Sequence, residues 1–409
     1  MRILYLHQYF NTRSNTGGTR SYEFARYLVN QGHQVTMLTA ASDHNAEAQG
    51  TNSYQVDGID VVGINAGYKD HIEGTRMSYP QRILNFLYFA IVSTWVGLRL
   101  PKADLVFATS TPLTIGIPGL IISKLRRIPL VFEVRDLWPE APVQIGALKS
   151  PLQIGLARWL ERTIYRNSAH IIALSPGMQD GVVATGISAS RVTMIPNASD
   201  VDLFTPTVDG SEFRQRLNLN GHFTCVYFGT MGEANGLNFV LDAAAELKNR
   251  QVSDVVIVLQ GDGKERPMLQ KRCQGEKLDN VIFADPVPKQ DVPKVVTGAN
   301  VAMTIFKNLP IFATNSPNKM FDSLAAGRPV LVNMPGWMQE LVEENRAGVF
   351  VQPDNPVDFA DKIIFLRDNP ALCAEYGRNA RQLAEEKFAR HKLAAQLEQV
   401  FLNVVRPKR

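Results

Sequence analysis

The stretch NSPNKMFDSLAAGRPV, residues 315–330, has the pattern of a short helix that runs directly into a strand. The helix begins at Pro317 and Asn318, and its apolar residues recur at helical spacing. Gly327 and the proline two positions later end it before a strand over residues 330–333. The N-terminus of such a helix presents free backbone N–H groups and the positive end of the helix dipole to whatever lies in front of it.

The side chains of this helix suit a ligand in which a phosphate is joined to a sugar. Lys319 adds a cation to the first turn, and Asp322 lies one turn further on, where it can accept hydrogen bonds from hydroxyl groups. The alternative is an ordinary capped helix in which Lys319 and Asp322 pair with each other at positions i and i+3. This segment alone leaves both interpretations open.

Length and composition predict two globular domains, because 409 residues with 45% hydrophobic content exceed what one core usually supports. The net charge is +4, and the basic residues do not form one long block of the kind that binds nucleic acid. We therefore expect no nucleic acid partner, while acidic substrates or an anionic membrane surface remain open. Three distant cysteines, Cys225, Cys273 and Cys373, lack metal-ligand spacing, so we expect a reducing cytosol and no structural zinc.

The chain opens with MRILYLHQYF, which has the pattern of a buried strand without the features of a signal peptide, so we expect it to stay inside the cell. The longest apolar run, residues 83–98, falls short of the roughly 20 residues that a membrane span needs. This segment is either a core helix or a helix that also binds a membrane surface, with Trp95 at the interface. Basic residues that could meet anionic lipid lie nearby, namely Arg99, Lys102, Lys124, Arg126 and Arg127.

Strands and helices alternate along both halves of the chain, which predicts an α/β protein with parallel βαβ units. The first half contains expected strands at 2–7, 34–38, 59–64, 105–108, 130–134 and 170–173, with helices at 19–31, 82–100, 115–125 and 152–165. The second contains strands at 223–228, 255–260, 281–284, 301–305, 330–333 and 348–351, with helices at 237–250, 267–275 and a helical tail at 357–404. The linker IPNASDVDLFTP, residues 195–206, separates two doubly wound domains that would face one another across a cleft.

Glycine loops follow expected strands in both halves. Gly17 and Gly18 would let backbone N–H groups approach an anion closely, because no Cβ atom intervenes. Neither this pair nor the loop at 229–236 has the GxGxxG spacing, which argues against a dinucleotide-dependent oxidoreductase. The Gly261-Asp262-Gly263 triplet is either an ordinary tight turn or a nucleotide contact.

Six segments in this order resemble the retaining glycosyltransferases of family 4, particularly the bacterial branch that builds surface polysaccharides. They are MRILYLHQYFN…GGTRSYEFARYLVNQGHQVTMLT, VFEVRDLWPEAPV, ALSPGMQDGVVATGISASRVTMIPNASDVDLF, VYFGTMGEANGLNFVLDAA, LQGDGKERPML and SPNKMFDSLAAGRPVL. The resemblance spans nearly the whole chain and implies the GT-B fold, with two Rossmann-like domains and a C-terminal helix that crosses back to the first. Residues 1–200 with 390–409 would form the acceptor-side domain, and residues 201–389 would bind the nucleotide sugar.

The resemblance also implies site residues. The donor would be held by Gly17, Gly18, Gly229, Thr230, Gly232, Gly261, Asp262, Val287, Pro288, Asn315, Ser316, Pro317, Asn318 and Asp322. Within this set Asp322 would take the ribose hydroxyls, and the backbone at Val287 and Pro288 would contact the base. The catalytic residues would be Arg135, Asp136 and Lys319, and the acceptor-binding residues would be Arg20, Trp138 and Glu140. Arg135 and Asp136 could instead be a structural ion pair, but charges just past a strand end of an open sheet favour a site.

The chain departs from the family pattern at three positions. Thr230 and Asn235 stand where the family has the Arg and Lys of its phosphate loop, and Thr314 replaces the first of two glutamates. Lys319, with Arg135 or Lys307, would then carry more of the charge that neutralises the diphosphate.

Asp200-Val201-Asp202 spells the DxD pattern of metal-dependent transferases of another fold. It matches the family's interdomain segment, so we expect hydrogen-bonded turn residues, no metal site and no cofactor.

The leading hypothesis is a retaining, metal-independent transferase that moves a sugar from a UDP-sugar to a polyprenyl-diphosphate-linked saccharide. The product would be O-antigen, capsule or exopolysaccharide, and the protein would bind peripherally to the cytoplasmic face of the inner membrane, helped by the basic residues 406–409. The alternatives are a nucleotide-sugar 2-epimerase of the same fold and a noncatalytic assembly scaffold.

Overall fold

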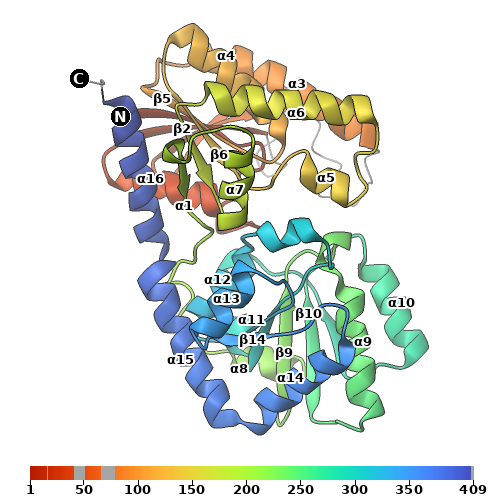
Figure 1. Cartoon of the computed structure of the whole chain (residues 1–409). Coiled ribbons are helices and arrows are strands. Elements are labelled where there is room, and N and C mark those ends of the chain that lie inside the picture. Colours follow the sequence, from red (N-terminus) through yellow and green to blue (C-terminus); the bar gives the residue numbers. More distant parts are fainter. Residues whose placement is uncertain (16, 41–50, 66–78, 407–409) are drawn as a thin grey trace. The chain divides into compact units, whose positions relative to one another are not determined.

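A computed structural model describes residues 1–15, 17–40, 51–65 and 79–406 (Figure 1). The chain forms two compact units. The first comprises Met1–Thr12, Thr19–Pro196 and Leu393–Arg409, and the second comprises Arg13–Gly18 and Asn197–Lys392. Residues 407–409, part of the expected basic C-terminus, lie outside the described residues.

The first unit is built on an eight-stranded sheet with the order β3-β4-β2-β1-β5-β6-β7-β8. Its strands are β1 (Arg2–Leu6), β2 (Gln34–Ala40), β3 (Thr51–Val56), β4 (Ile59–Ile64), β5 (Leu105–Thr109), β6 (Leu130–Val134), β7 (His170–Ala173) and β8 (Val192–Met194). Among these strands only β3 pairs antiparallel, with β4. The central strands β5 and β6 are buried along their whole length, because helices cover both faces of a parallel sheet.

The helices of this sheet are α1 (Arg20–Asn30), α3 (Tyr79–Gly97), α4 (Gly116–Arg126), α5 (Glu140–Gln144), α6 (Pro151–Asn167) and α7 (Pro176–Ala184). Helices α3, α4 and α6 lie side by side in Figure 1. They share a core cluster with strands β5 and β6 that includes Phe89, Ile122 and Ile164. Within the described ranges, no helix combines the length and the apolar character needed to cross a bilayer.

The second unit has a six-stranded sheet with the order β11-β10-β9-β12-β13-β14, in which every observed strand pair is parallel. Its strands are β9 (Phe223–Phe228), β10 (Val255–Gln260), β11 (Val281–Ala284), β12 (Val301–Thr304), β13 (Val330–Val332) and β14 (Gly348–Phe350). Its helices are α8 (Ser211–Arg216), α9 (Leu237–Asn249), α10 (Arg266–Glu276), α11 (Val292–Thr297), α12 (Asn318–Ala325), α13 (Trp337–Glu344), α14 (Pro356–Asp368) and α15 (Pro370–Lys387).

The α/β fold class with two doubly wound parallel sheets is confirmed, and the C-terminal tail is corrected. The single expected helix over residues 357–404 is three helices, α14, α15 and α16 (Arg390–Val405). The first break falls at Asn369, because Pro370 disfavours helical dihedral angles in the residue before it. From Leu393 onward the chain belongs to the first unit, where Phe401 packs on Phe107 with ring centroids 5.0 Å apart.

Candidate functional site

Helix α12 of the second unit begins at Asn318, as the sequence predicted, and Gly327 beyond its end has a φ of 66°. Lys319 in its first turn reaches back toward strand β9. The Lys319 Nζ lies 2.8 Å from the hydroxyl of Tyr227 and 3.1 Å from Oδ1 of Asn235. The ammonium also lies over the Tyr227 ring, 4.0 Å from its centroid. The interpretation in which Lys319 pairs with Asp322 is therefore wrong.

The surroundings of Lys319 change its protonation. Burial lowers the pKa of Lys319 to about 7, because an ammonium loses hydration among the aromatic rings. A phosphate placed beside this ammonium would raise its pKa again, since an opposite charge favours the protonated form. Lys319 therefore has the position and the chemistry of an anion-binding residue.

The glycine loop between β9 and α9 lies on the other side of the Lys319 ammonium. A Cβ atom on Gly229, whose φ is 136°, would lie in van der Waals contact with Lys319, 3.6 Å from its Cε. Asn235 of the same loop donates through Nδ2 to the carbonyl of Thr230 at 2.9 Å. The loop and the first turn of α12 thus come together within one unit. Gly232 lines a cavity of about 490 Å³ in this unit, to which Lys307 also contributes.

The Gly261-Asp262-Gly263 turn packs directly on this glycine loop. The backbone N–H of Met231 donates to the carbonyl of Asp262 at 2.8 Å. A Cβ atom on Gly261 would lie 2.1 Å from the carbonyl oxygen of Gly229, so only glycine allows this approach. The Asp262 carboxylate accepts from the N–H of Gly263 and is largely exposed. The turn is therefore close enough to Gly229 to share a ligand with it.

Asp322 lies one turn further along α12 and is buried, with 1% of its surface exposed. Its Oδ1 accepts from the hydroxyl of Ser199 at 3.0 Å, and its Oδ2 forms an ion pair with Lys289. The ammonium of Lys289 lies 4.6 Å from the centroid of the Phe204 ring. Sequence analysis missed Lys289, although it directly follows Val287 and Pro288, the pair assigned to the nucleotide base. A ribose would have to share or displace these partners of Asp322.

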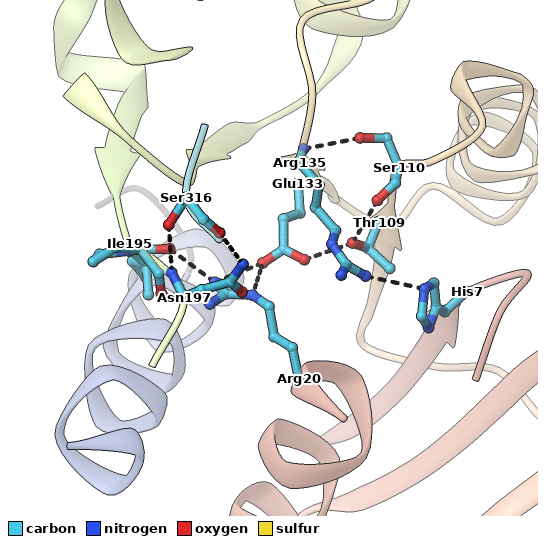
Figure 2. Close-up of polar contacts among 10 residues, drawn as sticks. His7, Arg20, Thr109, Ser110, Glu133, Arg135, Ile195, Asn197 and Ser316 are labelled. Carbon is cyan, nitrogen blue, oxygen red and sulfur yellow. Dashed lines mark hydrogen bonds and ion pairs between the residues drawn. The ribbon is translucent and has the colours of Figure 1, made fainter. Parts of the chain in front are cut away.

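Asn315 and Ser316, two further donor candidates of the second unit, have partners within it. The carbonyl of Asn315 accepts from the indole N–H of Trp337 at 2.9 Å. The Ser316 hydroxyl accepts from the backbone N–H of Asn197 at 3.0 Å (Figure 2). Gly17, with a φ of 111°, and Gly18 belong to the same unit. The Gly17-Gly18 pair and the α12 segment, placed in different domains by the sequence, therefore belong to one compact unit.

In the first unit, three strands bring polar residues to the same edge of the sheet. His7 follows β1, Ser110 follows β5 and Arg135 follows β6, and these strands are parallel neighbours. The Arg135 Nη1 lies 3.2 Å from Nε2 of His7, and the Arg135 backbone N–H donates to the Ser110 hydroxyl at 2.9 Å (Figure 2). Burial and the charge of Arg135 hold the pKa of His7 well below its ordinary value. His7 is therefore neutral and positions Arg135.

Sequence analysis missed His7, although its place directly after the first strand was a usable signal. Asp136, next to Arg135, accepts a hydrogen bond from the Thr111 hydroxyl at 3.3 Å. Burial raises the pKa of Asp136 to about 6, and the opposing charge of Arg135 offsets only part of this effect. A carboxyl group with this pKa can exchange a proton near neutral pH.

Arg20, an expected acceptor-binding residue, has no exposed surface. Its guanidinium pairs with Glu133 at 2.9 Å and donates to the carbonyls of Ile195 and Pro196 at 2.8 and 2.5 Å (Figure 2). Glu133 also accepts from the hydroxyl of Thr109 at 2.5 Å. A guanidinium with these partners cannot touch an acceptor in this conformation, so Arg20 is a structural residue that anchors the end of the first unit.

The other two acceptor candidates lie near α5 and α6. Trp138 is partly buried against the core of the first unit and lines a large cavity there. The carboxylate of Glu140 pairs with Arg158 at 2.8 Å on the exposed surface. Both residues belong to the segment that directly follows Arg135 and Asp136.

The DxD triplet forms a turn. Asp200 pairs with Arg13, and its Oδ1 accepts from the backbone N–H groups of Asp202 and Leu203, both at 3.2 Å. The carboxylate of Asp200 is therefore held by one ion pair and two turn hydrogen bonds, as expected for a hydrogen-bonded turn residue.

Two glycosyltransferase family models match this chain. Residues 15–198 match the model of a glycosyl transferase 4-like domain, and residues 222–369 match that of glycosyl transferases group 1. The chain is 22% identical to the alpha-D-kanosaminyltransferase of Streptomyces kanamyceticus over 69% of this chain and 73% of that protein. It is 24% identical to the putative colanic acid biosynthesis glycosyl transferase WcaI of Escherichia coli K12, over 78% and 79%.

A solved structure of Anabaena Alr3699/HepE in complex with UDP-glucose has a similar fold. The TM-score is 0.71 at 19% identity, and the alignment covers 98% of this chain and 100% of that one.

Proposed function

This chain is a glycosyltransferase with the GT-B fold, and we propose that it transfers a sugar, with retention of anomeric configuration, from a UDP-sugar to a polyprenyl-diphosphate-linked saccharide. The product would be a bacterial surface polysaccharide. The observation that carries the donor assignment is the position of Lys319, whose ammonium lies between the first turn of α12 and the glycine loop.

The second unit would hold the diphosphate of the donor. Backbone N–H groups at the start of α12 and the cation of Lys319 would meet the phosphate oxygens, and the Gly229 loop would allow close approach. These groups can stabilise the charge that develops on the leaving diphosphate without a metal ion. The commitment of Asp200 to a turn supports the same proposal, because it removes one carboxylate of the DxD pattern.

The reaction would proceed on one face of the sugar. The acceptor hydroxyl oxygen forms a bond to the anomeric carbon while the bond from that carbon to the diphosphate breaks, and the hydroxyl proton passes to the leaving phosphate oxygen. The protein then positions the reactants and stabilises charge. Arg135, held by His7, is the residue of the first unit best prepared for such a role.

The choice of UDP and of a lipid-linked acceptor rests on relatives. HepE binds UDP-glucose, and WcaI is named for colanic acid biosynthesis. The lipid-linked acceptor, the membrane surface and the peripheral location belong to the same proposal.

One observation favours a second function, a nucleotide-sugar 2-epimerase. Such an enzyme needs a group that exchanges protons at the sugar, and the pKa of Asp136 near 6 would suit that task. Release of a free epimer from the donor without any acceptor would identify it.

The deciding experiment is calorimetric titration of the purified protein with UDP and with GDP, each with and without EDTA. We expect micromolar binding of UDP that EDTA does not change. Binding that EDTA abolishes would overturn metal independence, and preference for GDP would overturn the choice of base. If neither nucleotide binds, the donor site is wrong and the noncatalytic scaffold becomes the better explanation.

A further inference from the structure

The first unit contains a cavity of about 960 Å³, at the upper end of the range for small-molecule sites. Its wall is formed mainly by apolar side chains from three helices and the segment after β6. They include Phe86 and Leu87 of α3, Ile117 of α4, Trp138, and Leu156 and Leu160 of α6. A cavity of this size and lining fits a hydrocarbon ligand.

Two polar residues that line the cavity adjoin the candidate site. Gln8 follows His7 directly, and Thr111 donates the hydrogen bond to Asp136. The cavity is therefore continuous with the sheet edge that carries His7, Arg135 and Asp136. A ligand in it would have its apolar part among the helices and its polar part at these residues.

The outer surface around the cavity is unusually apolar. Eleven of the fifteen large hydrophobic residues that are exposed in the described structure fall between residues 84 and 159. Two of them on α3, Ile91 and Trp95, are 70% and 54% exposed, and two on α6, Leu152 and Trp159, are 83% and 61% exposed. Such a concentration marks a surface that contacts a lipid or a partner.

The charge of this region favours lipid. Residues 82–167 contain eleven basic and five acidic residues, a net charge of +6, whereas the whole chain carries +4. The guanidinium of Arg99 lies 3.2 Å from the ring centroid of Trp95, an arrangement that suits the boundary between hydrocarbon and anionic head groups. Positive charge beside exposed apolar side chains complements a lipid that carries phosphate.

We propose that this cavity binds the hydrocarbon chain of the lipid-linked acceptor and so presents the attached saccharide at its polar end, beside Thr111 and Asp136. The proposal rests on the proposed function and adds to it a defined lipid subsite on the first unit. In this proposal Trp138, which lines the cavity, binds the acceptor by contacting its hydrocarbon chain.

Binding of farnesyl diphosphate, a short isoprenoid, to the whole protein tests this subsite, with inorganic diphosphate as the probe for the anion alone. Ala157→Phe would fill the cavity from α6, and Ala147→Phe would fill it from the preceding loop in case the first variant folds poorly. Ala371→Phe, at an exposed position of α15 in the second unit, is the matched control. Thermal melts establish that each variant is folded.

We expect the wild type and Ala371→Phe to bind farnesyl diphosphate at least tenfold more tightly than either cavity variant, and inorganic diphosphate to show no such difference. Equal binding by wild type and a folded cavity variant would overturn the proposal. So would a cavity variant that leaves isoprenoid binding unchanged but alters the oligomeric mass in light scattering, because the surface would then be a protein contact.

Titration of the same samples with UDP separates this proposal from the proposed function. UDP binding without isoprenoid binding would leave the donor assignment in place and remove the lipid subsite. Isoprenoid binding without UDP binding would support the lipid subsite and remove the donor assignment.

Discussion

The ammonium of Lys319 lies 3.1 Å from Oδ1 of Asn235, the position at which the resembling family carries the lysine of its phosphate loop. The two residues are 84 positions apart in the chain and come from α12 and the glycine loop. The loop lysine is absent from this chain, but the ammonium of Lys319, which comes from α12, lies beside the position that it would occupy. This relationship explains how the second unit could neutralise a diphosphate without the loop lysine.

Donor affinity should depend on pH through Lys319. Because its pKa in the free protein is about 7, Lys319 is cationic below that pH and loses its proton above it. The diphosphate binds the cationic form, so the affinity for a UDP-sugar should be constant below pH 7 and fall by up to about tenfold per unit above it. Calorimetry across pH 6–9 measures this, and Lys319→Met should flatten the profile.

The control for that profile is Lys294→Met, because Lys294 is half exposed and pairs with the exposed Glu212 at 3.4 Å. This variant should keep the pH dependence of the wild type. A flat profile in the wild type would mean that Lys319 does not meet the donor phosphates.

Moving the cation back to the loop should restore binding. Lys319→Met should weaken UDP binding by about 10- to 100-fold. This range corresponds to the loss of one hydrogen bond to a charged group, which contributes about 1.5–3 kcal/mol. Adding Asn235→Lys to that variant places an ammonium on the other side of the same contact and should recover most of the loss. No recovery in a folded double variant would show that the two positions do not serve one ligand.

The buried pair of Lys289 and Asp322 should be essential for stability. Removing one partner leaves an uncompensated charge in the interior, so Lys289→Met or Asp322→Asn should lower the free energy of unfolding by about 3–5 kcal/mol. The double variant should recover much of this loss. Urea denaturation measures these values, with Lys294→Met as control because Lys294 is exposed and its partner Glu212 is exposed too.

The same variants test the assignment of Asp322 to the ribose. If the carboxylate also accepts from ribose hydroxyls, the stable double variant should bind UDP much more weakly than the wild type. Undiminished affinity in that variant would restrict Asp322 to its structural role.

The carboxyl group of Asp136 should make the folded protein less stable at neutral pH, although it contributes to catalysis. Its pKa is raised to about 6, so between about pH 4 and pH 6 the folded state binds more protons than the unfolded chain, and stability falls as pH rises through that window. Asp136→Asn should therefore be more stable than the wild type at pH 7, by on the order of 1–3 kcal/mol. Its turnover should be lower at all pH values.

Thermal unfolding at pH 4 and pH 7 checks the sign of this effect, since the gain should vanish at the lower pH. Asp180→Asn, at an exposed position of α7, is the control and should change neither quantity. A variant that is no more stable at pH 7 would contradict the raised pKa of Asp136.

Several elements of this protein could be predicted because their signals are local. The α12 helix, its start at Asn318 and its end at Gly327 follow from spacing, capping and glycine within sixteen residues. Both parallel sheets follow from the alternation of apolar strands with amphipathic helices. The break at Asn369 was equally local, because a proline follows it, and could have been found.

By itself, then, the sequence determined the two α/β sheets and the glycine turns, because backbone preferences and hydrophobic periodicity act over neighbouring residues. Only the tertiary structure decided the partners of the polar side chains: Lys289 with Asp322, His7 with Arg135, and Arg20 with Glu133. These pairs join residues 33 to 128 positions apart. Their contacts arise when parallel strands and helices pack into one core, and no local pattern specifies which buried charge will meet which.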